Sequence, residues 1–313
     1  MFENITTDLA IAPAEDEDRH DLSAFPGTRE AVVYMLPIPE YRCAGIIYTW
    51  VSAEGKAGAS CTFFGEGVGG TVDERCDQID VPADMNFFDW DVGGLQLRIE
   101  RLFETATVSY RGERIEMEFH FEAMHPVFPF SAHRKGCPPY YASDRTEQHG
   151  MAKGFFKVDG KEFKLDHFCQ RDRSWGPRIW GLNQHYKWFH ATTEHVAAHF
   201  FEMQSFGRVH QLGYVFKDNH MAEITNLKHD FIFDEDMHHR SIYVVATDSS
   251  GRTTSINCER IAKFTYPVDP MIQLNESPIA VEIEGRKGSG WCEFCWNANY
   301  LEFAKQHVEY ANK

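Results

Sequence analysis

The chain has 313 residues, 43% of them hydrophobic, which is enough for one large or two ordinary domains with apolar cores. Its formal net charge of -16 argues against binding to nucleic acid or to anionic membranes, because both would repel it. Aromatic residues make up 14% of the chain, a share that favours β-structure and an apolar pocket.

Residues 1–30 form an acidic arm, with a run of carboxylates at 15–18, which we expect to pack on the body of the protein or on a partner. The N-terminus has neither the basic nor the apolar region of a signal peptide, and no apolar run approaches the roughly 20 residues that cross a bilayer. We therefore expect a cytoplasmic protein without membrane insertion. The 8 cysteines are scattered, which is typical of reduced thiols.

The first half of the chain has mainly β-strand patterns. Residues 44–51 alternate and place Ile46, Tyr48 and Trp50 on one face, and further strands are expected at 62–64, 95–103, 107–110 and 114–123. The last of these alternates apolar residues with Glu or His, and we favour a solvated outer face over a polar barrel lining. Residues 124–145 are rich in proline and aromatic residues, which indicates a lid or a domain linker.

The second half opens with a hairpin in which strands at 155–158 and 162–168 flank the turn Asp159-Gly160. Further strands are expected at 186–192, 196–206, 209–216, 223–233, 241–247, 253–264, 280–284 and 291–297. Strands at this spacing, with one helix expected at 300–310, predict a sandwich or a barrel. If 291–297 is a strand, the thiols of Cys292 and Cys295 point to opposite faces, which argues against a zinc knuckle.

Residues 170–181 combine Asp172, three arginines and the indoles of Trp175 and Trp180. Glycine and proline at 176 and 177 interrupt a sheet, so we expect this stretch to leave the strand before it. One interpretation is a site at a barrel mouth, in which Asp172 acts as acid or base beside Arg171 or Arg178. The other is a buried Arg–Asp latch that holds a domain junction, and both can hold at once.

The same stretch, R-D-x-S-W-G-x-R, resembles the signature of the tandem lipocalin-like proteins related to carotenoid 1,2-hydratase and to AttH-like proteins. Two further segments match this group, Glu147-Gln148-His149-Gly150 and the glycine-rich turn that leads to Glu293. Where the pattern usually has histidine after the aspartate, this chain has Arg173. The resemblance implies an all-β fold of two lipocalin-like antiparallel barrels or sandwiches in tandem with a short C-terminal helix. Their expected ranges are 31–150 and 151–313.

No nucleophile elbow, phosphate-binding loop or zinc-protease motif is present in the sequence, so we expect acid–base chemistry without a cofactor or a metal. Candidate residues are polar groups that can move protons and aromatic or charged groups that can hold a substrate. The predicted catalytic residues are Asp172, Glu147, Glu293 and His149, and the predicted substrate-binding residues are Trp175, Trp180, Arg178, His125, Tyr48 and Trp50.

These residues favour a lyase of the hydratase, dehydratase or cyclase type, acting on an apolar prenyl-like or aromatic small molecule bound between two β-barrels. In the group that the chain resembles, carotenoid hydratase protonates an alkene and water captures the cation. The alternative is a non-catalytic carrier of an apolar ligand, which needs the aromatic wall but no converging carboxylates. A third hypothesis is a scaffold whose acidic arm binds a protein, and the sequence leaves a homodimer open.

Overall fold

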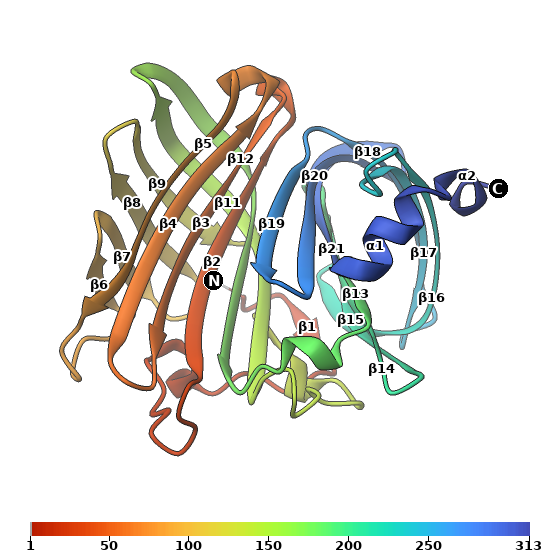
Figure 1. Ribbon diagram of the computed structural model, residues 1–313. Helices are drawn as coiled ribbons and strands as arrows, with labels where there is room; N and C mark the ends of the chain where they lie inside the picture. Colours follow the sequence, from red (N-terminus) through yellow and green to blue (C-terminus); the bar gives the residue numbers. More distant parts are fainter. Residues whose placement is uncertain (1) are drawn as a thin grey trace. The chain divides into compact units, whose positions relative to one another are not determined.

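The computed structural model describes residues 2–313 and consists of two antiparallel β-sheets with two short helices at the C-terminus (Figure 1). Contacts divide the chain into two units. The first contains residues 10–36 and 44–178, with residues 2–3, and the second contains residues 179–313, with the short segments 4–9 and 37–43. Among the described residues, none of the helices has the length and the apolar content that crossing a membrane requires.

The first unit is one strongly curved sheet. Its strand order is β5 (Gly70–Asp80), β4 (Lys56–Gly65), β3 (Cys43–Ser52), β2 (Arg29–Ile38), β12 (Lys161–Gly176), β11 (Asp144–Val158), β9 (Ile115–Ala123), β8 (Thr105–Arg111), β7 (Leu95–Arg101) and β6 (Asp89–Val92), with β10 (Phe128–Pro129) paired to β11. The ring of Tyr34 on β2 meets those of Phe119 and Phe121 on β9, at 5.8 and 5.5 Å between centroids. Since two strands separate β2 from β9, these rings can meet only on the concave side, which is therefore the barrel interior.

The alternation in β9 is confirmed as a solvated outer face. Ile115, Met117, Phe119 and Phe121 are buried, whereas Glu118, His120 and Glu122 are exposed. Residues 124–143 are mostly irregular, as expected, with the short β10 and the 3-10 turn η4 (Phe130–Ala132), whereas Asp144 and Arg145 already begin β11.

The hairpin turn is also confirmed, because Asp159 and Gly160 both have positive φ, 50° and 79°, as a type I′ turn requires. The expectation that residues 170–176 leave the sheet is wrong. β12 continues to Gly176, where φ is 94° and a β-carbon would meet Ser143 Oγ at 2.1 Å. The strand is stable along this stretch because β11 on one side and β2 on the other exchange backbone hydrogen bonds with it.

The second unit is a closed ring. Its order is β16 (His220–Phe233), β15 (Arg208–Lys217), β14 (Val196–Ser205), β13 (His185–Thr192), β21 (Arg286–Asn297), β20 (Ile272–Ile283), β18 (Thr253–Arg260) and β17 (His239–Asp248), which returns to β16. The strands β1 (Thr6–Thr7) and β19 (Phe264–Asp269) attach to β16 and β20. The helices α1 (Ala298–Lys305) and α2 (Val308–Ala311) place Leu301, Ala304 and Val308 against the core of this ring, as the sequence predicted.

Two expected boundaries differ from the contact division. The first unit extends to residue 178 instead of 150, because the β11–β12 hairpin pairs with β9 and β2 of the first sheet. The range 1–30 is not a separate unit either, since residues 10–30 belong to the first unit and contain the fully buried Glu17.

Candidate active site

Two carboxyl groups of the second unit lie side by side. Glu276 on β20 and Glu293 on β21 are direct partners in the antiparallel register and share a hydrogen bond. Only 3% of Glu276 and 9% of Glu293 is exposed. The Trp291 indole N–H donates to Glu276 Oε2 at 2.7 Å, and the Tyr186 hydroxyl donates to Glu293 Oε1.

This pair holds a proton at neutral pH. Burial raises the pKa of Glu276 well above its ordinary value, and the negative charge of Glu293 raises it further. Two adjacent buried carboxylates cannot both ionise at low cost, so the pair consists of one carboxylic acid and one carboxylate. The Trp291 hydrogen bond lowers the pKa of Glu276, but burial outweighs it, so we place the proton of the pair on Glu276.

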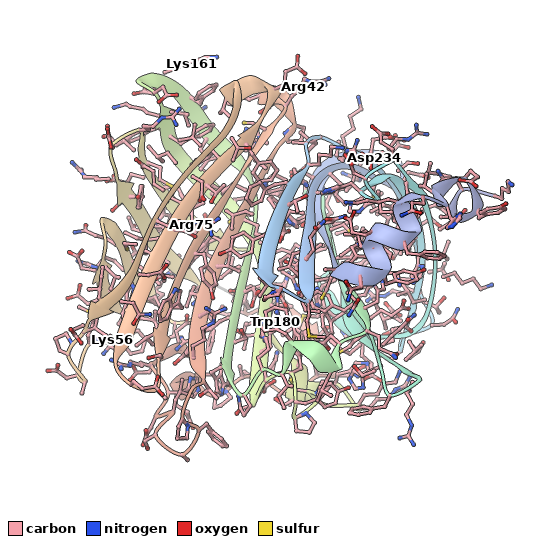
Figure 2. The ribbon with its side chains drawn as sticks, in the orientation of Figure 1. Arg42, Lys56, Arg75, Lys161, Trp180 and Asp234 are labelled. Carbon is pink, nitrogen blue, oxygen red and sulfur yellow. The ribbon has the colours of Figure 1, made fainter. Side chains whose placement is uncertain are left out.

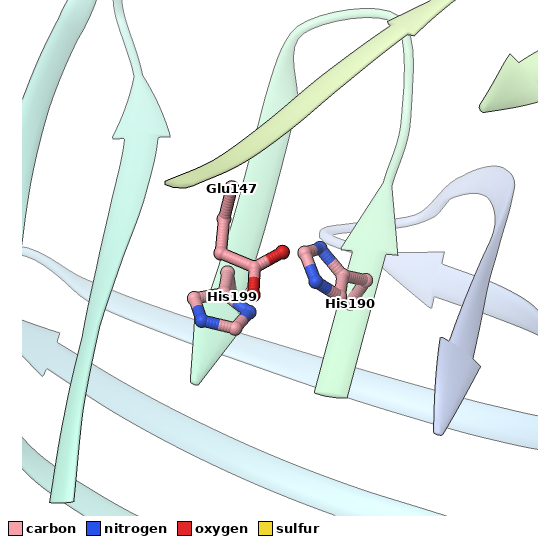
Figure 3. Close-up of side chains that lie close together, drawn as sticks. All are labelled: Glu147, His190 and His199. Carbon is pink, nitrogen blue, oxygen red and sulfur yellow. The ribbon is translucent and has the colours of Figure 1, made fainter. Parts of the chain in front are cut away.

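The face of the sheet that carries these carboxyl groups is aromatic. Trp188 on β13 lies opposite Glu293, His190 lies opposite Trp291, and His199 on β14 lies opposite His190. Figure 3 shows the two imidazoles, whose ring centroids are 4.3 Å apart. All of these side chains except Glu293 are at most 1% exposed. A carboxylic acid among indole rings can protonate an apolar molecule, and the π faces can stabilise the resulting cation.

The central stretch of the first unit forms a different cluster. Arg145 on β11 donates from Nε to Glu147 Oε1 at 2.5 Å, from Nη2 to Asp172, and from Nη1 to the Tyr141 hydroxyl at 2.8 Å. The expected partners of Asp172 were Arg171 or Arg178, and the observed partner is Arg145. The strand register explains the difference. Glu147 lies directly opposite Asp172, and Arg145 is two residues from Glu147 on β11, so the three side chains project from the same face of the sheet.

Arg145 is a cation of this cluster. Burial disfavours the charged form of Arg145, yet Asp172 and Glu147 raise its pKa well above the ordinary value, so the guanidinium stays charged. The cluster therefore joins this guanidinium to the carboxyl groups of Glu147 and Asp172. It can act in acid–base chemistry or as a buried latch, the two roles expected for Asp172.

Trp175 does not line the face that carries Asp172. The two residues are three apart on one strand and so point to opposite faces. The Trp175 indole stacks on the His20 imidazole, with 4.0 Å between ring centroids. On the same face Arg171 pairs with Glu17, and Arg173 donates from Nε to Glu30 at 2.9 Å. The acidic arm thus supplies the carboxylate for Arg171.

His125 and His149 form a buried pair in the first unit, with 3.2 Å between His125 Nε2 and His149 Nδ1. Burial lowers the pKa of His125 to about 4, although a hydrogen bond to the Pro126 carbonyl opposes the shift. His125 is therefore neutral near pH 7, and His149 lies two residues from Glu147 on the same face of β11.

Of the remaining predicted residues, Arg178 borders the Arg145 cluster through Tyr141, whose ring centroid lies 4.4 Å from the Arg178 guanidinium carbon. Tyr48 and Trp50 share a face, as expected, but it is the half-buried one, where Arg29 lies 5.9 and 5.8 Å from their rings. Arg178 donates to Ser174 Oγ and to the Tyr141 carbonyl, each at 3.1 Å. Trp180 belongs to the second unit and begins the 3-10 turn η5 (Trp180–Leu182) (Figure 2).

Glu276, Tyr186, Trp291 and Arg145 were not among the site residues predicted from the sequence. Glu276 lies at the start of a long strand, and only the end of that strand, residues 280–284, was expected. Trp291 and Glu293 alternate in the sequence, a usable signal for a shared face. Arg145 was assigned to an irregular segment, so no partner on a strand could be inferred for it.

These features occur in a chain that belongs to a recognised family. A family described as a domain of unknown function (DUF7064) matches residues 13–298, and the protein is a member of it. No curated protein matches in sequence.

Solved structures with the same architecture include an AttH-like protein from Nitrosomonas europaea, at 11% identity and a TM-score of 0.66, covering 92% of this chain and 97% of the other. CghA, solved with Sch210972, has 11% identity and a TM-score of 0.63 over 94% and 97% of the two chains. Kievitone hydratase from Nectria haematococca has 10% identity and a TM-score of 0.60 over 93% and 97%. At these identities the likeness establishes the fold, two successive barrel-like β-sheets, which the sequence predicted.

Proposed function

We propose that the protein is a cofactor-independent lyase of the hydratase, dehydratase or cyclase type, acting on an apolar prenyl-like or aromatic small molecule. The observation that carries this proposal is the buried carboxyl pair Glu276 and Glu293 on an aromatic face of the second unit. A carrier needs the aromatic residues, but it does not need a carboxylic acid held protonated at neutral pH.

Each group has a role in the proposed hydration. The Glu276 carboxylic acid transfers its proton to one carbon of an alkene and becomes a carboxylate, and the second carbon becomes a cation. Trp188 and Trp291 stabilise that cation through their π faces. Water adds to the cation and loses a proton to a carboxylate of the pair, which restores the starting state. The balanced result is the addition of one water molecule, and the reverse sequence is a dehydration.

Capture of the same cation by a second double bond of the substrate, followed by loss of a proton, gives cyclisation without a change in composition. The architecture shared with kievitone hydratase supports the hydratase type as a fold-level analogy.

The test is a screen of prenyl and aromatic alkenes in D₂O, with mass spectrometry of the products. Hydration by this route places one deuterium on the carbon that Glu276 protonates, and the product gains one D₂O. Glu276→Gln keeps the shape and the hydrogen bonds but has no proton of comparable acidity, so we expect its turnover to fall about 100-fold or more. Glu282→Gln, an exposed change on the same face of the same strand, is the matched control.

The outcomes separate enzyme from carrier. Deuterated product from wild type and from Glu282→Gln, but not from Glu276→Gln, supports the lyase. Equal turnover by Glu276→Gln removes the carboxyl pair from the reaction. Binding of the same molecules without any product favours the carrier.

A further inference from the structure

A row of three polar side chains crosses the interior of the first unit. Gln148 on β11, Arg171 on β12 and Tyr34 on β2 are direct neighbours in the registers of the two strand pairs, so they project from one face. That face is the barrel interior, because Tyr34 packs on the rings of β9 and the Arg171 guanidinium carbon lies 5.9 Å from the Tyr34 ring centroid.

Each member of the row has a buried polar atom without a hydrogen-bond partner among residues 2–313. These atoms are the Tyr34 hydroxyl, Arg171 Nε and Gln148 Oε1, and Arg173 Nη1 is a fourth, two residues along β12. Tyr34 and Gln148 are 2% and 0% exposed. Leaving a buried donor or acceptor unpaired costs about 1–3 kcal/mol for each group, so several in one row indicate a site for a hydrogen-bonding ligand.

The other atoms of these side chains are fixed, which orients the unpaired ones. Gln148 Nε2 donates to the carbonyls of Phe103 and His125 at 2.7 and 2.9 Å, so its Oε1 is the acceptor that faces the row. Arg171 donates from Nη2 to Glu17, which leaves Nε as its free donor. Burial and the positive charge of Arg173 lower the pKa of Arg171 to about 9, consistent with a guanidinium that is short of acceptors.

The ion pairs around these unpaired atoms favour a ligand without a net charge. Arg171 and Arg173 are already matched by the carboxylates of Glu17 and Glu30. Although burial opposes it, Arg173 and His20 lower the pKa of Glu30, so Glu30 is ionised. An added anion would leave the interior with excess negative charge, which burial disfavours.

We propose that the interior of the first unit binds a neutral apolar molecule through one hydroxyl group. The hydroxyl oxygen accepts from Arg171 Nε and from the Tyr34 hydroxyl, and the hydroxyl hydrogen is donated to Gln148 Oε1. Tyr34, Phe119 and Phe121 contact the apolar part. This site is independent of the carboxyl pair in the second unit, and it is a binding site without a reaction.

The test uses three probes that differ only in their head group: 2-naphthol, naphthalene and 2-naphthoate. Isothermal titration of the full chain should give tighter binding of 2-naphthol than of naphthalene, and weaker binding of the anionic naphthoate. Tyr34→Phe removes only the unpaired hydroxyl, so we expect an unchanged or higher melting temperature and a roughly threefold to tenfold loss of 2-naphthol affinity.

Tyr110→Phe is the matched control, because Tyr110 is buried in the same sheet and its hydroxyl pairs with Glu74. It should lower stability and leave the preference for 2-naphthol unchanged. A crystal structure of the wild type with 2-naphthol is the second measurement, and it should place the probe oxygen within hydrogen-bond distance of Tyr34 and Arg171.

Equal affinity for 2-naphthol and naphthalene, or a preference that survives Tyr34→Phe, overturns the proposal and leaves ordered water as the partner of these atoms. Failure of all three probes to bind also overturns it. Glu276→Gln separates this result from the lyase proposal, since it should leave 2-naphthol binding to the first unit unchanged.

Discussion

Glu276 and Glu293 face each other across β20 and β21 and are joined by a hydrogen bond, with Trp291 donating to one and Tyr186 to the other. The Trp291 hydrogen bond lowers the pKa of Glu276, but burial and the neighbouring carboxyl group outweigh it. The proton resides on Glu276 because burial and the charge of Glu293 both act against its ionisation.

The first prediction concerns the pH dependence of stability. Glu276 has a raised pKa in the folded protein and an ordinary value of 4.5 in the unfolded chain. Between these two values the folded state binds more protons than the unfolded state, so the free energy of unfolding falls as the pH rises, by up to about 1.4 kcal/mol per pH unit. Glu276→Gln lacks this proton. Urea unfolding from pH 5 to pH 8 should therefore show the variant gaining stability relative to wild type as the pH rises.

Glu282→Gln is the control here too, because it removes an exposed carboxylate from the same strand. A stability difference between Glu276→Gln and wild type that stays flat across this pH range would contradict a proton held on the pair.

Both carboxyl clusters could have been found by counting outward from a turn. The turn Asp159-Gly160 sets Val158 opposite Lys161, and the same count places Glu147 opposite Asp172. The turn Glu284-Gly285, with φ of 54° and 79°, sets Ile283 opposite Arg286 and, further out, Glu276 opposite Glu293. In an antiparallel pair the turn fixes the register. The strands predicted from the sequence were too short for the register to be counted as far as these carboxyl groups.

Other contacts were not predictable in this way. Arg171 and Glu17 are 154 residues apart, and no local pattern tells which carboxylate of the acidic arm reaches the barrel interior. The acidic arm precedes β2, so the pairing of β2 with β12 brings the arm to Arg171. Such long-range strand pairing depends on the packing of the whole sheet. Where the signal was local, as in the alternation of β9 or the apolar side of the C-terminal helices, the predictions are confirmed.

The second prediction compares the unfolding free energies of two variants of the Arg145 cluster, one that removes its cation and one that removes a carboxylate. Arg145→Met removes the buried guanidinium that pairs with both Glu147 and Asp172, and we expect it to cost about 3–5 kcal/mol of unfolding free energy. Asp172→Asn also removes one charge, but it leaves the neutral pair Arg145–Glu147, so its cost should stay within about 1 kcal/mol. Chemical denaturation of both variants measures the difference.

The catalytic activity of the Asp172→Asn variant then shows which of the two roles Asp172 has. We expect Asp172→Asn to be folded and inactive if the cluster takes part in acid–base chemistry. Full activity in the folded variant would make the cluster a latch. Equal destabilisation by the two substitutions would contradict the charge count.

The third prediction is that the acidic arm stabilises the first unit. Glu17→Gln keeps the size of the side chain but only one of the two oxygens that accept from Arg171 and from the Phe103 backbone N–H, and it removes the buried negative charge. We expect a loss of about 3 kcal/mol, because the buried guanidinium loses its counter-charge. Glu15→Gln, an exposed change two residues away, should stay within about 0.5 kcal/mol. Equal melting temperatures for the two variants would mean that the arm does not contribute through this ion pair.

The fourth prediction concerns the thiols, all eight of which are free. Cys43, Cys61, Cys169, Cys258, Cys292 and Cys295 are buried, and burial raises the pKa of Cys61, Cys169 and Cys292 well above the ordinary value. Cys76 and Cys137 are partly exposed, and burial also raises the pKa of Cys137, to about 12.

The thiolate is the reactive form, so Ellman's reagent at pH 8 should modify at most Cys76 and Cys137 in the folded protein, and slowly. Unfolding in guanidinium chloride should release all eight at once, with identical counts before and after reduction. Rapid modification of Cys292 or Cys295 in the folded protein, located by peptide mapping, would show that β21, the strand carrying these two thiols and Glu293, opens to solvent. Opening of β21 would also expose Glu276 on the paired strand β20, so this measurement tests the burial on which the proposed acid chemistry depends.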